Sequence, residues 1–253
     1  MVEAKRIAFA DRGAWLGDLS STPPKAIERM LSKDYAAERR KEINKEKAAA
    51  DYKPLSIEGR ITPGGGDDPI GRGDTIYLTA ADAEGNVISL IQSLYETFGA
   101  GIVAGDTGIV LHNRASLFSL TPGHPNQIAP GQRPFHTLIP AMVLKAGAPW
   151  LSFGVMGGDM QAQGHAQVLA NLIDFGMNIQ EAGEAPRFRH SGNGLALESA
   201  FSADARAGLT ARGHRLIDSR GVWGGFQGIL IDPKTRVLMA GSDPRKDGMA
   251  AGW

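Results

Sequence analysis

A threonine hydroxyl at the start of a strand is the first group in this sequence that raises a question of chemistry. Thr75 stands in GRGDTIYLTAADAEGN, where a glycine-rich segment ends and a strand pattern begins. Threonine is an ordinary residue to begin a strand, so its position alone does not indicate catalysis. If the chain were cut before Thr75, the new α-amino group, with a pKa of about 8, would be a base beside the hydroxyl. Thr75 is therefore a candidate nucleophile, and its hydroxyl could make the cut itself by attacking the Asp74 carbonyl.

Two consecutive glycines form the second candidate. The segment PWLSFGV predicts a strand that runs into Gly157 and Gly158, and a helix pattern starts at Asp159. Glycines at such a junction let backbone N–H groups face a ligand, and the helix dipole adds positive potential. A pair of such amides can stabilise an oxyanion during acyl transfer. The alternative interpretation is a purely structural strand-to-helix turn that Asp159 caps.

Other familiar signatures are missing from the sequence. There is no G-x-S-x-G, no H-E-x-x-H and no Walker loop. The count of cysteines is zero, which excludes thiolate ligands and a cysteine nucleophile, and the six histidines show no metal-like spacing. GAGIVAG, from Gly99, has the wrong spacing for a dinucleotide loop, and His165 is interpreted as a satisfied polar residue. We therefore expect neither a metal nor an organic cofactor.

The balance of charge limits the classes of partner. Lys+Arg 27 equals Asp+Glu 27, so the net charge of +0 gives no global field that would attract nucleic acid or an anionic membrane. No apolar run approaches the roughly 20 residues that span a bilayer. We expect a small-molecule substrate, and neither nucleic acid nor membrane as a partner. The first residues, MVEAKRIAFADR, are charged and amphipathic, and the compartment stays open.

The elements that must position these residues change character near residue 74. Residues 1–50 predict helices, VEAKRIAFADR and then KAIERMLSKDYAAERRKEINKEKAAA, and residues 56–74 predict a loop. TIYLTAAD and NVISLIQSL predict a hairpin around AEGN. Further strands are predicted in TGIVLHN, TLIPAMVLKAG, PWLSFGV, GFQGILID and RVLMAG. Helices are predicted in DMQAQGHAQVLANLIDFG, after Gly176 and near SADARAGLTARG, an order that indicates layered α and β structure.

Several blocks in order resemble the γ-glutamyltranspeptidase (glutathione hydrolase) family of N-terminal-nucleophile hydrolases. GDTIYLTAADAEGNVISLIQSLYETFGAG resembles the opening of the family's small subunit, and EAKRIAFADRGAWLGD resembles the last helical part of the large subunit. Between and after them stand IVAGDTGIVLHNR, RPFHTLIPAMV, GVMGGD, NLIDFGMNIQEAGEAPRFRH and SDPRKDGMAAGW. The resemblance implies an α+β fold, the αββα sandwich. It assigns residues 1–74 to the end of the large subunit with its processing linker, and residues 75–253 to the small catalytic subunit.

The resemblance also implies roles for individual residues. Asp74–Thr75 becomes the processing bond, and Thr75 both cuts the chain and attacks the substrate. Ser93 matches a second hydroxyl that hydrogen-bonds the nucleophile, while Gly157 and Gly158 match the oxyanion hole. The positions that contact the substrate correspond to Tyr95, Asn113, Arg114, His136 and Thr137. The implied reaction is γ-glutamyl hydrolysis or transfer without a cofactor.

The implied substrate pocket departs from the family pattern. Tyr95 stands where the well-studied bacterial members carry a polar residue, and Leu117 where they carry the acid that grips the substrate α-amino group. His136 and Thr137 replace paired serines, and Arg114 replaces a neutral amide. We expect a weakened preference for free γ-glutamyl compounds, because an acyl group of the glutaryl type, which lacks the amine, suits Arg114 better. The alternatives are a cephalosporin- or glutaryl-acylase-like amidase and an inactive remnant.

The implied sandwich is also incomplete. The first predicted helix begins at Met1 without a capping residue, and its apolar side chains need a partner surface, so we expect a chain that starts inside a longer architecture. The family's large subunit extends far upstream and supplies an arginine for the substrate carboxylate. We therefore expect an exposed apolar sheet face, and as partner either the missing large-subunit portion or a second copy.

Overall fold

The computed structural model describes residues 1–58, 73–192, 194–218 and 223–253, without the side chain of Asp74. Most of the predicted 56–74 loop thus lies outside the described residues. The helices are α1 (Val2–Trp15), α2 (Pro24–Leu31), α3 (Lys33–Arg40), η1 (Arg114–Leu117, 3-10), α4 (Met160–Ile173), α5 (Ile179–Glu184) and α6 (Ala203–Ala211). The strands are β1 (Gly73–Ala81), β2 (Val87–Glu96), β3 (Ala141–Lys145), β4 (Ala148–Met156), β5 (Phe188–Ser191), β6 (Gly194–Leu197), β7 (Leu216–Ile217), β8 (Gly225–Ile231) and β9 (Leu238–Ser242).

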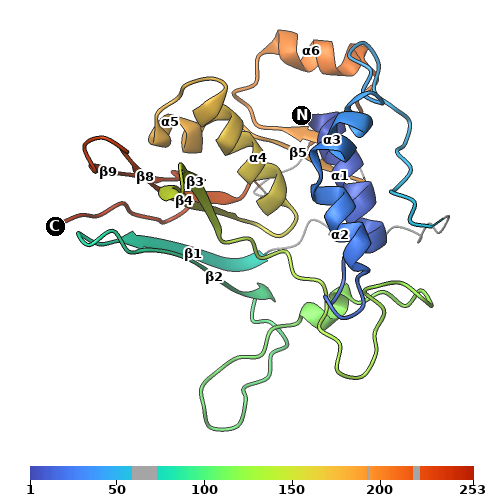
Figure 1. Cartoon of the computed structure of the whole chain (residues 1–253), viewed down its shortest axis with the longest axis horizontal. Helices are drawn as coiled ribbons and strands as arrows, with labels where there is room; N and C mark the ends of the chain where they lie inside the picture. Colours follow the sequence, from blue (N-terminus) through green and yellow to red (C-terminus); the bar gives the residue numbers. More distant parts are fainter. Residues whose placement is uncertain (59–72, 193, 219–222) are drawn as a thin grey trace.

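Two sheets packed face to face form the centre of the molecule (Figure 1). One is antiparallel with strand order β3-β4-β8-β9, and the other is the β1-β2 hairpin. A side chain at Gly154 on β4 would place its Cβ 2.3 Å from the Tyr77 ring of β1, so this glycine lets the hairpin approach. Helices α4 and α5 cover the other face of the four-stranded sheet. The α+β class predicted from the sequence is confirmed, with helix, sheet and sheet as successive layers.

The third sheet joins the beginning of the chain to its later half. Its strand order is β5-β6-β7, with β6 and β7 parallel. Phe188, Leu195 and Leu197 form its buried cluster, against which Val2 of α1 packs. Residues that the family resemblance assigns to two different subunits are therefore in direct contact.

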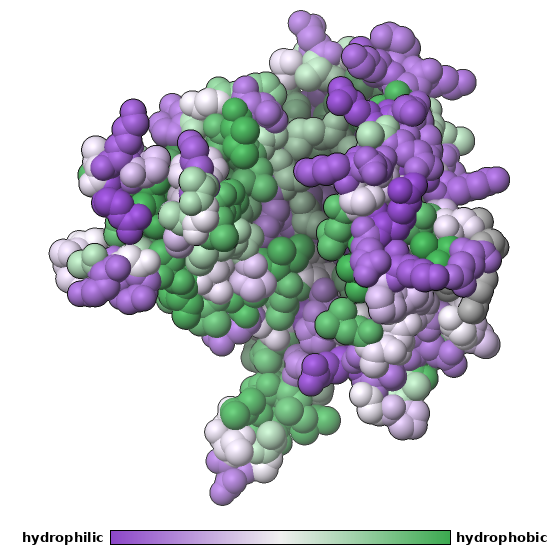
Figure 2. Space-filling model, in the orientation of Figure 1, coloured by the Kyte–Doolittle hydropathy of each residue, from purple (hydrophilic) through white to green (hydrophobic). Residues whose placement is uncertain are grey.

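A long projecting segment follows β2. It runs from Thr97 to His112, and its described contacts include a single bridge between Val103 and Val110. Its large apolar side chains face solvent, with Phe98 77% and Ile109 62% exposed. Figure 2 shows this hydrophobic surface on the projection below the sheets. Such an apolar projection is typical of a surface that another polypeptide covers.

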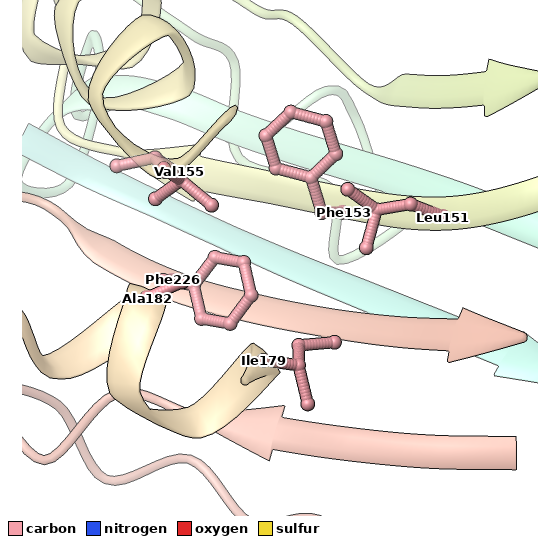
Figure 3. Close-up of a cluster of buried hydrophobic side chains, with 7 residues drawn as sticks. Leu151, Phe153, Val155, Ile179, Ala182 and Phe226 are labelled. Carbon is pink, nitrogen blue, oxygen red and sulfur yellow. The ribbon is translucent and has the colours of Figure 1, made fainter. Parts of the chain in front are cut away.

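The main core lies between the four-stranded sheet and its helices (Figure 3). Leu151, Phe153 and Val155 alternate along β4 and point to the same face, because side chains of a strand repeat with a period of two. Phe226 of β8 lies against them, and the remaining buried members are Val168, Ile179 and Ala182. This core fixes the direction in which β4 leads into the Gly157–Gly158 turn.

The N-terminal helices have a small core of their own. Ala14, Trp15, Ala26, Tyr35 and Leu55 are buried together. The Trp15 indole donates to the Leu55 carbonyl at 2.7 Å, and this bond ties α1 to the segment beyond α3. Helix α1 thereby presents a fixed face to the rest of the molecule.

Three predicted elements were wrong in extent. The single helix predicted over residues 25–50 is in fact two helices, α2 and α3, of which the second ends at Arg40. Ser32 separates them, because its hydroxyl caps α3 by accepting from the Tyr35 amide. TGIVLHN contains only the Val110 bridge. In TLIPAMVLKAG the strand begins after Pro140, which has no N–H to donate to a ladder. Strands β5, β6 and β7 were not predicted.

Candidate active site

The Thr75 hydroxyl lies 2.8 Å from the Ser93 hydroxyl. The two residues are register partners on β1 and β2, and the register shifts between Asp74 and Thr75. Such an irregularity turns side chains away from a regular ladder and is over-represented near active sites. The half-buried Thr75 side chain is thus held beside a second hydroxyl, at the boundary where the sequence predicted a cut.

Tyr95 holds Ser93 from the other side. The Tyr95 amide donates to the Ser93 hydroxyl oxygen at 2.8 Å, and Tyr95 is the register partner of Asp74. Its φ of 77° places a bulky residue in the left-handed region, which costs about 1–3 kcal/mol. Backbone strain is therefore stored directly opposite the Asp74–Thr75 bond.

The Gly157–Gly158 turn connects β4 to α4 as predicted. Gly157 has a φ of 120° and Gly158 a φ of 58°, both in the region that favours glycine. A Cβ at Gly157 would lie 3.0 Å from the Gly224 Cα, so the turn also packs closely on a neighbouring loop. The carbonyls of the two glycines accept from the amides of Met160 and Gln161, which start α4. Among the described residues, no protein acceptor takes the amide hydrogens of Gly157 or Gly158.

Arg114 and Thr137 come together with Tyr95. The Arg114 guanidinium lies 4.9 Å from the Tyr95 ring centroid and donates to the Thr137 hydroxyl at 3.1 Å. Arg114 is 1% exposed. Burial of this permanent positive charge beside the nucleophile hairpin is costly unless anionic or polar groups surround it. These three predicted substrate residues therefore form one cluster with Ser93.

His136 lies next to this cluster, and Asn113 is hydrogen-bonded to Glu96. The His136 and His112 rings meet edge to face with centroids 5.7 Å apart. Burial lowers the pKa of His136, the hydrogen bond to the Pro134 carbonyl opposes this effect, and the Arg114 charge lowers the pKa further. The Asn113 amide donates to the Glu96 carboxylate at 2.7 Å, and its oxygen accepts from the Glu96 backbone amide. Asn113 thus ties the end of the projecting segment to Glu96, the last residue of β2.

Two cavities meet at the nucleophile hairpin. Thr75 lines one of about 460 Å³ together with Met156, Gln227 and the C-terminal residues 246–251. Met156 is the last residue of β4, so the glycine turn begins at the wall of this cavity. Ser93 and His112 line the other cavity, of about 490 Å³. The nucleophile candidate therefore lies between a space on the sheet side and a space on the side of the projecting segment.

One ion pair of the site was not predicted. The Arg12 guanidinium of α1 binds the Asp159 carboxylate at 2.5 and 3.0 Å. Asp159 is the residue before α4, but its side chain makes no capping hydrogen bond, so the cap that belonged to the alternative interpretation of this turn is not formed. The two residues are far apart in the sequence, and no local pattern predicts their contact. Leu117, where the family resemblance implies an acid, ends η1 and its carbonyl accepts from the Asn126 side chain.

Two further properties of the described part of the chain bear on the kind of site. No group of three or more His, Asp or Glu side chains there is placed to hold a metal ion. None of the helices described has the length and apolar character needed to cross a membrane.

Comparison with known proteins places this geometry in a family. The family model described as Gamma-glutamyltranspeptidase matches residues 1–253. The Glutathione hydrolase-like YwrD proenzyme of Bacillus subtilis is 38% identical over 264 residues, and the Glutathione hydrolase proenzyme of Escherichia coli is 33% identical over 270 residues. Each alignment covers 100% of this chain, but only 46% and 44% of those relatives.

A solved structure agrees in fold with the whole chain. The crystal structure of cephalosporin acylase from Bacillus halodurans superposes with a TM-score of 0.85 at 40% identity, covering 100% of this chain and 44% of that one. The chain therefore spans less than half the length of the relatives and of the structure that it matches. By the family model and by these relatives, the chain belongs to the gamma-glutamyltranspeptidase family of hydrolases and transferases.

Proposed function

We propose that this chain is an acyl hydrolase or acyl transferase whose nucleophile is Thr75, activated by a cut between Asp74 and Thr75. The observation that carries the proposal is the 2.8 Å contact between the Thr75 and Ser93 hydroxyls at a register shift of the hairpin. A hydroxyl held in this way has a defined orientation before any substrate arrives. Residues 1–74 and 75–253 are then the two products of the cut.

The cut follows from the same hydroxyl. The Thr75 oxygen attacks the Asp74 carbonyl carbon, the peptide nitrogen leaves as the free amine of Thr75, and an ester joins the two residues. Water then hydrolyses the ester, which releases the Asp74 carboxylate and restores the hydroxyl. The left-handed φ of Tyr95, the partner of Asp74 across the hairpin, supports this step, because such strained backbone is concentrated at sites that react.

Catalysis on a substrate repeats the chemistry with an external amide. The α-amine of Thr75, with a pKa of about 8, takes the proton of the hydroxyl as the oxygen attacks the acyl carbon. The Gly157 and Gly158 amides then stabilise the tetrahedral oxyanion, a role that oriented backbone donors perform in acyl transfer. The leaving amine takes the proton, and water or a second amine removes the acyl group from Thr75.

The charges around the pocket favour an acyl group that carries a carboxylate. Arg114 is buried and permanently charged, and the His136 ring beside it stays neutral more readily because burial and the Arg114 charge lower its pKa. A ligand carboxylate would pair with the Arg114 guanidinium. No acid stands at Leu117 to pair with an α-ammonium group, and loss of such a partner costs on the order of 2–5 kcal/mol. We infer that a glutaryl-type group binds better than a γ-glutamyl group.

This preference makes a cephalosporin- or glutaryl-acylase-like amidase the second candidate. The proteins that this chain resembles include both a glutathione hydrolase and a cephalosporin acylase, which supports keeping both candidates. The two candidates share Thr75 and the glycine turn. They differ only in whether the pocket must hold an α-ammonium group.

A complementing polypeptide is part of the proposal. The outer face of the β1-β2 hairpin exposes Ile76, Leu78, Ile88 and Leu90, each at least 45% exposed. The projecting segment adds further apolar surface (Figure 2). Since the relatives are about twice as long, we propose that a polypeptide equivalent to their remaining part covers this face. A second copy of the chain is the alternative occupant.

The experiment compares wild type, Thr75→Ala and Thr75→Ser on glutaryl- and γ-glutamyl-p-nitroanilide. The proposal expects wild-type turnover with the higher kcat/KM on the glutaryl compound, partial retention in Thr75→Ser, and none in Thr75→Ala. A burst of p-nitroaniline that matches the enzyme concentration, with the acyl mass on the peptide that begins at Thr75, identifies the intermediate. Equal turnover by wild type and Thr75→Ala would overturn the assignment.

A further inference from the structure

We propose that Arg12 of α1 is a positioning residue for the Gly157–Gly158 turn, acting through its ion pair with Asp159. The inference rests on the proposed function, because it concerns the amides that would face the oxyanion. It assigns a role in the reaction to a helix that lies upstream of the processing bond.

The contact has the geometry of a strong, oriented ion pair. Both terminal nitrogens of Arg12 reach Asp159, at 2.5 Å to Oδ1 and 3.0 Å to Oδ2. The Asp159 side chain is 4% exposed and that of Arg12 is 17% exposed. A fork of two parallel bonds fixes direction as well as distance, which a single ammonium group cannot do. Largely buried, the pair escapes most of the screening that weakens surface pairs.

Asp159 is directly bonded to the turn that the pair would position. Its side chain does not cap α4 and points to α1 instead. The turn is therefore followed directly by a residue whose carboxylate is held in place by Arg12. Both glycines have a positive φ, where the backbone of glycine is less restricted than that of other residues. The ion pair of Asp159 adds a restraint at the end of the turn, beside the packing of Gly157 on Gly224.

The same guanidinium contacts the segment that carries the acyl-pocket residues. Arg12 lies 5.2 Å from the Phe135 ring centroid and 3.9 Å from that of Phe9. Phe135 immediately precedes His136 and Thr137. The Ile139 amide of this segment donates in turn to the Gln161 side chain of α4. Arg12 thus fixes the position of the Gly157–Gly158 turn relative to the segment that carries His136 and Thr137.

Charge gives the pair a second effect on the reaction. Asp159 directly follows in sequence the two glycines whose amides would stabilise a developing negative charge. Without Arg12 this carboxylate loses a cation that balances its charge, so its repulsion of the oxyanion increases. Removal of the cation alone is therefore expected to harm the transition state more than removal of both charges.

The test measures kcat and KM of the wild-type chain and of four variants: Arg12→Gln, Asp159→Asn, the double variant, and Arg12→Lys. Lys25→Gln is the matched control, since Lys25 and Glu58 form a pair in the same part of the chain with both side chains more than 70% exposed. We expect kcat of Arg12→Gln to fall about 10- to 100-fold, with KM within about 2-fold, because the loss concerns the transition state. The double variant regains about 10-fold of kcat, Arg12→Lys retains part of it, and Lys25→Gln resembles wild type.

A second measurement keeps the inference testable without activity. Wild type and variants labelled with 15N-glycine give the amide resonances and hydrogen-exchange rates of Gly157 and Gly158. Arg12→Gln should shift both resonances and speed their exchange, while Lys25→Gln should leave them in place. If wild type shows no turnover but these shifts occur, the proposed function fails and the positioning role stands. Unmoved glycine resonances, or a kcat of Arg12→Gln within 2-fold of wild type, would overturn the inference.

Discussion

The hydroxyls of Thr75 and Ser93 lie 2.8 Å apart on paired strands, at the one register shift of the β1-β2 hairpin. The Tyr95 amide donates to the same Ser93 oxygen at 2.8 Å. Ser93 therefore orients the threonine with an oxygen that is itself oriented by the backbone. This relay is the feature of the site that connects most directly to nucleophilic attack.

Loss of the Ser93 hydroxyl should slow both the cut and the turnover. In Ser93→Ala the Thr75 hydroxyl loses its oriented partner, and we expect both rates to fall about 100-fold. Ser93→Thr keeps a hydroxyl and should retain more activity. Ser89→Ala is the matched control, because Ser89 lies on the same strand and bonds the Tyr77 hydroxyl at 2.7 Å instead. Time courses of cleavage and p-nitroanilide release measure the effect, and equal loss in Ser89→Ala would contradict it.

An acid at position 117 should change the preferred acyl group. Leu117→Asp supplies a carboxylate for the α-ammonium group of a γ-glutamyl substrate, while it repels the carboxylate of a glutaryl group. We expect the ratio of kcat/KM for γ-glutamyl- over glutaryl-p-nitroanilide to rise at least about 10-fold. Leu117→Asn, which adds polarity without charge, controls for the loss of the leucine. A ratio that changes equally in both variants would show that Leu117 does not face the acyl group.

His165 should make the fold less stable in acid. Burial lowers the pKa of His165 to about 4, and its Nε2 accepts the Val155 amide at 3.0 Å, which requires the neutral ring. Because the unfolded ring titrates near 6.5, the unfolded state binds the extra proton first as the pH falls. The neutral His165 ring thus contributes about 3 kcal/mol to the free energy of unfolding above pH 6.5, and this contribution is lost as the pH falls to 4.

Urea unfolding of wild type and His165→Gln between pH 4 and pH 8 measures this dependence. The unfolding free energy of wild type should fall more steeply below pH 6.5 than that of the variant. The unfolding free energy of the variant should still fall somewhat with pH, because burial also lowers the pKa values of His136 and His214. Parallel curves for the two proteins would show that His165 is not the group responsible.

The buried Arg187–Asp243 pair should be a strong determinant of stability. Arg187 Nη2 lies 2.7 Å from Asp243 Oδ2, and the two side chains are 1% and 0% exposed. The same carboxylate oxygen accepts the Phe226 amide. Asp243→Asn keeps the shape but leaves the Arg187 charge without its anion, at an expected cost of about 3 kcal/mol. Thermal unfolding should show a clear drop in Tm, whereas the exposed Glu58→Gln should change it little; equal effects would contradict the argument.

The parts of the fold that sequence predicts well have local signals. The hairpin around AEGN, the strand PWLSFGV and the helix after Gly158 each carry a periodicity or a turn motif, and each is present as β1-β2, β4 and α4. Strands β5, β6 and β7 have two to four residues each, too few for a pattern to stand out. The helix over residues 25–50 was predicted too long because its composition favours helix on both sides of Ser32, where the side chain caps a new start.

The candidate site divides in the same way. Thr75, Ser93 and the two glycines stand in recognisable segments, and the hairpin register then brings Thr75 and Ser93 together. The Arg12–Asp159 pair joins residues separated by 147 positions, and only the packing of α1 against the β4–α4 junction creates it. The left-handed φ of Tyr95 is likewise a result of the register shift opposite it, which the alternating pattern of β2 does not reveal.

Intact mass spectrometry of the expressed chain, wild type beside Thr75→Ala, tests the role of Thr75 most directly. We predict that wild type yields two polypeptides, residues 1–74 and 75–253, and that they co-elute on size exclusion because contacts such as Arg12–Asp159 and His124–Gly13 join them. Thr75→Ala should remain one chain. A single uncut mass for both proteins would contradict the assignment of Thr75 as a self-activating nucleophile in this chain.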